Sequence, residues 1–184
     1  MTTTLPYHRV NTLTGTKSGR LIEDASEYAH LVKRARRPLL VVGPRVLTMT
    51  VVGKPLIEYA VEIAQSLNIP VCATAHTKKM LLEMGLEPAS SYDITEIINH
   101  LKDPEWQGVK KEGNHDLVMF LGIRTDLATQ GLSTLKHFAN HLKTMTLCKY
   151  YYPHASYSLP NFRKDEQWKE FLGAFITNLK QKEA

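Results

Sequence analysis

The stretch Arg37-Pro38-Leu39-Leu40-Val41-Val42-Gly43-Pro44-Arg45 decides the fold. Its apolar run is short and uniform, which is typical of a strand buried on both faces, as the strands of parallel sheets are. The Gly43-Pro44 pair then turns the chain at the carboxyl end of that strand. Open α/β sheets bind their ligands at that edge. We therefore expect the rest of the chain to cover this strand or to border the crevice beyond it.

Further strands alternate with helices along the chain. Apolar runs predict strands at residues 69–74, 116–122 and 144–150. Amphipathic patterns predict helices at residues 24–36, 54–68, 77–85 and 93–103. A further helix after residue 126 is predicted to end near residue 143, and the last helix spans residues 165–180. Two helices begin with a capping box, Asp24-Ala25-Ser26-Glu27 and Asp93-Ile94-Thr95-Glu96. Because no hairpin signal joins neighbouring strands, the sequence predicts a single-domain three-layer α/β/α sandwich with a mostly parallel sheet.

The first part of the chain differs from the rest in composition. Residues 1–20 are rich in Thr, Gly, Lys and Asn and are predicted to form an extended N-terminal arm ahead of the α/β domain, residues 21–184. The arm is either a disordered tail or a segment that lies on a partner subunit, since its scattered large apolar side chains otherwise lack a place to pack. Residues 46–52 are also too apolar for a solvent loop, which indicates a covered or interface position.

Composition excludes several classes of protein. The 184 residues carry a net charge of +5, and the local basic cluster at residues 33–37 is explained by a helix C-terminus, where cations complement the helix dipole. No nucleic-acid-binding motif accompanies this charge. Cys72 and Cys148 are far apart and form no C-x-x-C pair, and two free thiols indicate a reducing cytoplasm. No stretch approaches the length of a membrane span, so we expect neither a nucleic-acid nor a membrane partner.

Two predicted strands end in a glycine that is followed two residues later by an arginine. Glycine lets an anion approach the backbone, and arginine offers a charge-assisted fork to phosphate. His76 follows the strand at 69–74, where it either lines the same crevice or caps the next helix. The sequence therefore predicts a cofactor-binding set at this edge: Gly43, Pro44, Arg45, His76, Gly122, Ile123 and Arg124.

No catalytic or metal-binding arrangement stands out. Neither a G-x-G-x-x-G fingerprint nor a P-loop is present. His137 and His141 share a helix face, but no third ligand is indicated nearby, so a polar helix face is favoured over a metal site. The Tyr150-Tyr151-Tyr152-Pro153 run either stacks on a flat ring or forms a subunit contact. We assign no catalytic and no metal-ligating residue, and a separate enzyme on this fold is the least favoured function.

Three motifs resemble those of a known fold family. The runs R-P-L-L-V-V-G-P, I-P-V-C-A-T and H-D-L-V-M-F-L-G-I-R resemble the central domain of thiamine-diphosphate enzymes, a six-stranded Rossmann-like domain that binds FAD in some members. Over nearly its whole length the chain more closely resembles the epsilon subunits of archaeal acetyl-CoA decarbonylase/synthase complexes. The features that carry this resemblance are the size, the arm before Asp24, the G-P-R loop, the L-G-I-R strand end and the Tyr- and Pro-rich stretch before the last helix.

The resemblance implies a Rossmann-like sheet of about six strands and an accessory role. It implies a stabilising subunit paired with the large alpha subunit, which carries the nickel–iron–sulfur clusters of carbon monoxide dehydrogenase, in an alpha-two epsilon-two unit. It further implies help in passing electrons to FAD, which would bind at the strand ends named above. The alternative is a freestanding flavin- or nucleotide-binding electron-transfer module.

Overall fold

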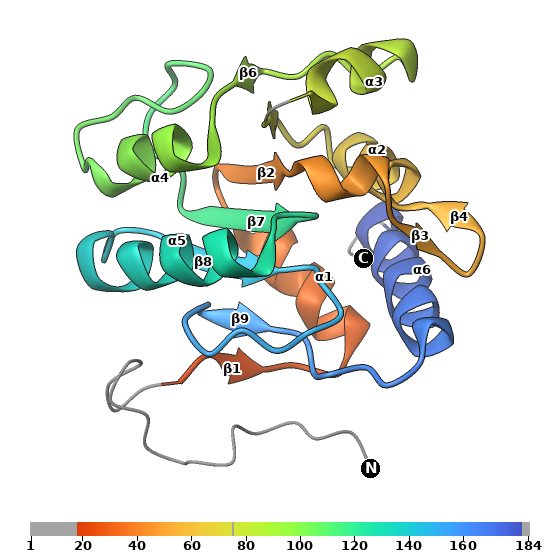
Figure 1. Cartoon of the computed structure of the whole chain (residues 1–184). Helices are drawn as coiled ribbons and strands as arrows, with labels where there is room; N and C mark the ends of the chain where they lie inside the picture. Colours follow the sequence, from red (N-terminus) through yellow and green to blue (C-terminus); the bar gives the residue numbers. More distant parts are fainter. Residues whose placement is uncertain (1–17, 75, 182–184) are drawn as a thin grey trace.

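The computed structural model describes residues 18–74 and 76–181, and within them seven strands form one parallel sheet (Figure 1). Its order is β1-β9-β8-β7-β2-β5-β6. The strands are β1 (Arg20–Leu21), β2 (Pro38–Val42), β5 (Val71–Ala73), β6 (Ser90–Ser91), β7 (Leu117–Leu121), β8 (Lys143–Thr146) and β9 (Tyr157–Ser158). The α-helices are α1 (Ala25–Arg34), α2 (Leu56–Ser66), α3 (Thr77–Glu83), α4 (Ile94–Lys102), α5 (Thr125–Phe138) and α6 (Asp165–Lys180). None of these helices is long and apolar enough to cross a bilayer.

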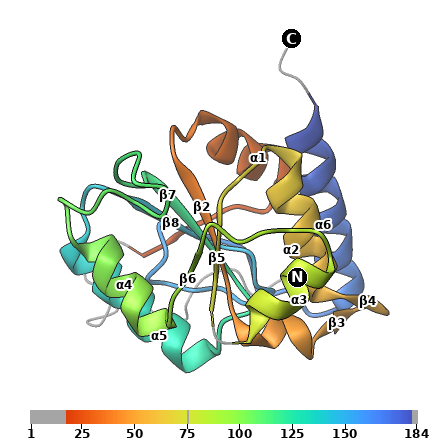
Figure 2. The same ribbon diagram turned by 90° about the horizontal axis from the view of Figure 1, so that it is seen from above.

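Strand β2 is the centre of the sheet, as the opening stretch predicts. It pairs in parallel with β7 on one side and β5 on the other, and residues 39–42 are fully buried. Its side chains alternate between two cores. Leu40 and Val42 face helices α1, α2 and α6, whereas Leu39 and Val41 face α4 and α5. Figure 2 shows these helices on opposite faces of the sheet, which confirms the three-layer sandwich.

The sheet has seven strands where about six were expected. The pattern-based prediction missed β1, β6 and β9, which have two residues each and are too short to give a hydrophobic period. Strand β1 also lies across the predicted boundary at residue 20, because Arg20 pairs with Tyr157 of β9. Residues 1–17 of the predicted arm, which was expected to span residues 1–20, lie outside the described residues.

The segment after β2 is the largest local departure from the prediction. It folds into the 3₁₀ helix η1 (Pro44–Leu47) and an antiparallel hairpin of β3 (Thr50–Val51) and β4 (Lys54–Pro55). The expectation that no hairpin occurs is therefore wrong here. Helix α2 begins at Leu56, so Pro55 stands just before the first turn rather than in it.

Other helix boundaries follow the sequence more closely. Asp24 caps α1 by accepting a hydrogen bond from the Ser26 amide at 2.8 Å, and α6 spans the predicted residues. Asn68 adopts φ +52°, the left-handed conformation expected of a helix stop. Helix α5, however, ends at Phe138 rather than near residue 143, where β8 already begins.

Candidate functional site at the carboxyl edge of the sheet

The carboxyl ends of β2 and β7 are adjacent, and the loops that follow them are bonded to each other. The Gly43 amide donates to the Leu121 carbonyl at 2.8 Å, and the Arg45 amide donates to the Gly122 carbonyl at 3.0 Å. These two amides are among the groups that would face a phosphate in a nucleotide-binding crevice. Here both are satisfied within the chain.

The two glycines at these strand ends are required by the close approach of the loops. A Cβ atom on Gly43 would lie 2.4 Å from the Gly122 carbonyl oxygen. Gly122 has φ +70°, and a Cβ atom there would lie 2.4 Å from Cγ1 of Val46. Glycine at both positions is therefore explained by packing of the protein against itself, without a ligand.

A small hollow remains beside this contact, with a volume of about 20 Å³, which is room for one water molecule. An FAD molecule does not fit there while the loops keep this arrangement. The hollow is lined by three of the predicted site residues, Arg45, Gly122 and Ile123, and by Tyr150 and Tyr152 of the tyrosine run. Its other lining residues, which the prediction did not place at a site, include Thr125, Cys148, Lys149 and Trp168.

The ionisable groups at the base of the hollow are held neutral. Burial raises the pKa of Tyr152 to about 12, and the neighbouring Cys148 adds to the shift. Burial likewise raises the pKa of the Cys148 thiol, against a smaller opposing effect of hydrogen bonds from the backbone at Gly122 and Ile123. The thiol of Cys148 is therefore protonated at neutral pH and is a poor nucleophile.

Exposed cationic and aromatic groups surround the hollow. Arg45 is exposed, and within the described residues it has no ion-pair partner. The ammonium of Lys149 lies 5.4 Å from the centre of the Tyr150 ring and 2.7 Å from the Asp165 carboxylate. The edge therefore offers a guanidinium and a flat ring to the outside, which suits either of the two roles predicted for the tyrosine run.

The remaining predicted site residues lie around this centre rather than in it. Pro44 begins η1 and is half-buried. Arg124 is exposed and pairs with Asp126 at 2.6 Å, so its guanidinium is directed along α5. His76 is exposed at the position before α3, without a side-chain cap bond, and does not line the hollow. The assignment of the seven residues to a cofactor stays a prediction.

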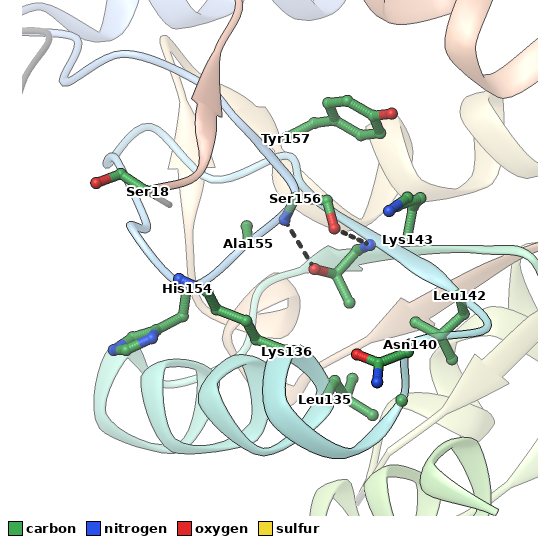
Figure 3. A pocket seen from close by; sticks show the side chains of 12 residues that line it. Ser18, Leu135, Lys136, Asn140, Leu142, Lys143, His154, Ala155, Ser156 and Tyr157 are labelled. Carbon is green, nitrogen blue, oxygen red and sulfur yellow. Dashed lines mark hydrogen bonds between the residues drawn. The ribbon is translucent and has the colours of Figure 1, made fainter. Parts of the chain in front are cut away.

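A larger hollow lies at the opposite, amino edge of the sheet, with a volume of about 340 Å³ (Figure 3). It is bordered by the end of α5, the start of β8 and the segment before β9. Thr144 and Ser156 bridge it with two reciprocal bonds of 3.1 and 3.0 Å between amide and hydroxyl groups. His154 is buried there, and burial, reinforced by Lys136, lowers its pKa. No predicted site residue lines this hollow; Lys136 lies in the last turn of α5, where a cation complements the helix dipole, and Lys143 begins β8.

Metal-ligating groups do not converge in the part of the chain that the structure describes. No three His, Cys, Asp or Glu side chains lie close enough together there to hold an ion.

Comparison with known proteins extends over most of the chain. Residues 1–175 match the family described as CO dehydrogenase beta subunit/acetyl-CoA synthase epsilon subunit. The acetyl-CoA decarbonylase/synthase complex subunit epsilon of Methanothermobacter thermautotrophicus is 46% identical over 142 residues, which cover 77% of this chain and 78% of the relative. The subunit epsilon 1 of Archaeoglobus fulgidus is 40% identical over 153 residues, which cover 82% and 80%. The subunit epsilon of Methanothrix soehngenii is 34% identical over 132 residues, which cover 71% and 68%.

Proposed function

The chain belongs to the family of acetyl-CoA decarbonylase/synthase epsilon subunits, and on that premise we propose that it is an accessory, stabilising subunit of such a complex. Its partner in this proposal is the large alpha subunit that carries the nickel–iron–sulfur clusters of carbon monoxide dehydrogenase. The observation that carries the proposal is the extent of the similarity, since the family match runs from residue 1 to residue 175. A shared ligand site alone would not require similarity over so much of the fold.

The geometry of the carboxyl edge supports a binding role rather than a catalytic one. The crevice between β2 and β7 is filled by the contact of Gly43 with Gly122, and beside it the buried phenol of Tyr152 and the half-buried thiol of Cys148 are neutral. In contrast, large apolar side chains such as Leu47, Val52 and Tyr150 are exposed at or near this edge. Exposed apolar groups of this kind are typical of protein interfaces.

The test is reconstitution from separate subunits. The full chain and the large subunit of the same organism are mixed and passed over a sizing column, and the rate of thermal loss of CO oxidation activity is measured with and without the chain. We expect one larger species and a slower loss of activity. Two separate peaks at micromolar concentrations, with unchanged activity loss, would refute the proposal.

A flavin-binding electron-transfer role is the second candidate, and one observation favours it. The exposed cation of Arg45 and the ring of Tyr150 line the same hollow, so the edge presents a phosphate-binding group beside a stacking surface. Binding would require the loops after β2 and β7 to separate. Titration with FAD, followed by flavin fluorescence, measures this directly. An affinity that is lost in Arg45→Ala and kept in Arg163→Ala, an exposed arginine distant in sequence, would support the flavin role.

A further inference from the structure

The tip of the β3–β4 hairpin has an unusual sequence for its shape. Val52 and Gly53 are its two central residues, and both have positive φ, +49° and +82°. Two positive φ values define a type I′ turn, whose first central position is normally Asn, Asp or Gly. Val52 is instead β-branched, and a β-branched side chain is strained in the left-handed region.

Folding of the chain alone does not account for valine at this position. The side chain of Val52 is 43% exposed, so burial returns little of the free energy that the strained backbone costs. Asparagine would form the same turn with less strain and more favourable hydration. Residues held in a sparsely populated conformation occur mainly where the surrounding structure fixes them for a function.

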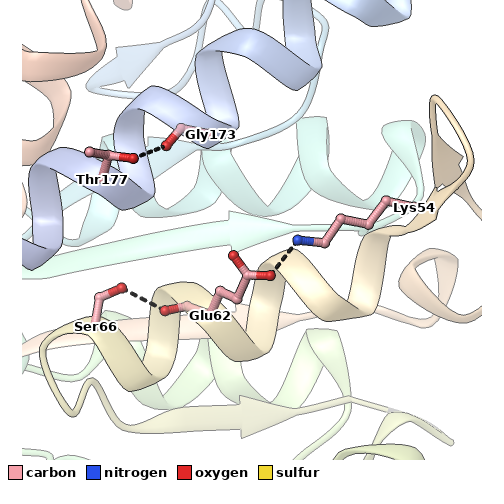
Figure 4. A network of polar contacts seen from close by, with 5 residues as sticks. All are labelled: Lys54, Glu62, Ser66, Gly173 and Thr177. Atoms are coloured by element: carbon pink, nitrogen blue, oxygen red, sulfur yellow. Dashed lines mark hydrogen bonds and ion pairs between the residues drawn. The ribbon is translucent and has the colours of Figure 1, made fainter.

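The rest of the hairpin is held firmly from behind. Val51, next to the tip, is fully buried, and the Met49 carbonyl accepts a 2.9 Å bond from the Leu56 amide. On β4, Lys54 pairs with Glu62 of α2, and its ammonium lies 4.3 Å over the ring of Tyr59. Figure 4 shows Lys54 reaching along α2 to Glu62. The tip is thus presented on a fixed base, as an interface anchor would be.

Helices η1 and α3 extend this surface. The two contact each other, and η1 leads along the chain into the β3–β4 hairpin. Leu47 of η1 and Met80 of α3 are exposed large apolar side chains. The exposed charges on the same elements are mostly positive, and they are Arg45, Lys78 and Lys79, with Glu83 paired to Lys79 at 3.8 Å. We call residues 45–54 together with α3 the hairpin surface.

We propose that the hairpin surface docks on the large subunit, with Val52 inserted into an apolar pocket whose rim carries carboxylates that face Lys78 and Arg45. This inference rests on the proposed function and adds the place of contact and the chemistry of the partner. The positive charges fit an acidic rim and would steer association, while the apolar tip is excluded from water at the centre.

The test uses Val52→Asn in the full chain, with two measurements on the same variant. The thermal midpoint of the isolated chain rises by a few degrees, because the turn strain is relieved. The dissociation constant for the recombinant large subunit, measured by calorimetry, increases at least about tenfold, because the buried contact is lost. Val52→Gly, which also accepts positive φ, gives the same loss of affinity and guards against an effect specific to asparagine.

Two further variants control the experiment. Phe138→Ser removes a side chain that is 67% exposed at the end of α5, on another part of the molecule, and leaves the affinity unchanged. Lys78→Glu weakens binding, and the difference from the wild-type chain shrinks as the salt concentration rises. Unchanged affinity of Val52→Asn, or a lowered thermal midpoint, would overturn the docking proposal while the complex itself still forms. Failure of the wild-type chain to bind the large subunit would instead refute the proposed function.

Discussion

The closed contact between the loops after β2 and β7 makes a sharp prediction about Gly43 and Gly122. Gly43 has an ordinary backbone conformation, φ −91° and ψ 168°, so alanine there adds no backbone strain and only collisions, with the Gly122 carbonyl and with Cδ1 of Ile123. Overpacking of this kind costs about 1–3 kcal/mol of the free energy of unfolding. Gly122→Ala adds left-handed strain, about 1–2 kcal/mol, to a collision of similar size with Val46.

Two other glycines separate these effects. Gly85 has φ +76° and no atom within 4 Å of a built Cβ, so Gly85→Ala carries the strain alone and costs about 1–2 kcal/mol. Gly173 lies inside α6 with open space around it, and Gly173→Ala stabilises the chain by up to about 1 kcal/mol. The expected order of stability is Gly173→Ala, wild type, then Gly85→Ala, with Gly122→Ala lowest.

Urea unfolding of the isolated chain, followed by tryptophan fluorescence, measures the series. A chain of this length loses roughly 2–4 °C of thermal midpoint per kcal/mol, so Gly122→Ala lowers the midpoint by at least about 4 °C. If Gly122→Ala costs no more than Gly85→Ala, and Gly43→Ala costs nothing, the two loops are not in contact. The crevice would then be open to a ligand, and the argument from packing would fail.

Two further outcomes follow from buried polar groups. The Tyr28 hydroxyl donates to the Thr146 carbonyl at 2.7 Å and is fully buried, so Tyr28→Phe lowers the free energy of unfolding by about 1–2 kcal/mol. Because burial raises the pKa of Tyr28 well above 10, the stability of the wild-type chain also falls as pH rises above 10. Denaturation curves from pH 8 to 11 should show a weaker decline in stability for Tyr28→Phe than for the wild-type chain. Burial lowers the pKa of His115 below 6.5, so the folded chain binds fewer protons than the unfolded chain and loses stability as pH falls through 6.5. The free energy of unfolding is measured for wild type and His115→Asn from pH 7.5 to 5. An equally steep decline in the two proteins would contradict this assignment.

The strong hydrophobic periodicity in the sequence was sufficient to predict the three layers of the fold. The uniform run at residues 39–42 identified the central strand, and the wide apolar stripe at residues 165–180 identified α6. Both features reflect burial against many neighbours, which a sequence pattern records well. Two-residue strands such as β1 and β9 leave no such record, because their place depends on pairing between distant segments.

The site was less accessible to sequence reasoning. A glycine at a strand end has the same appearance whether it admits a phosphate or another loop, and only the 2.4 Å approach of Gly43 to Gly122 distinguishes the two. Tyr152 and Cys148 line the hollow from the loop after β8, and no sequence pattern indicated that this loop lies next to the end of β7. The hairpin escaped notice because its turn reads Val52-Gly53 rather than Asn-Gly. That same departure from the usual turn is the main observation behind the proposed docking of Val52 on the large subunit.

The first and last helices of the described residues lie in the same layer of the molecule. Helix α1 packs on α6, with the Tyr28 ring 5.5 Å from that of Phe171, and Lys33 donates to the Gln181 carbonyl at 2.7 Å. Strand β1, at the edge of the sheet, likewise pairs with a late segment of the chain, β9. During synthesis, therefore, the apolar side of α1 is fully covered only after α6 has left the ribosome. A chain that stops before α6 therefore leaves apolar side chains of α1 uncovered, and exposed apolar surface of this kind favours aggregation.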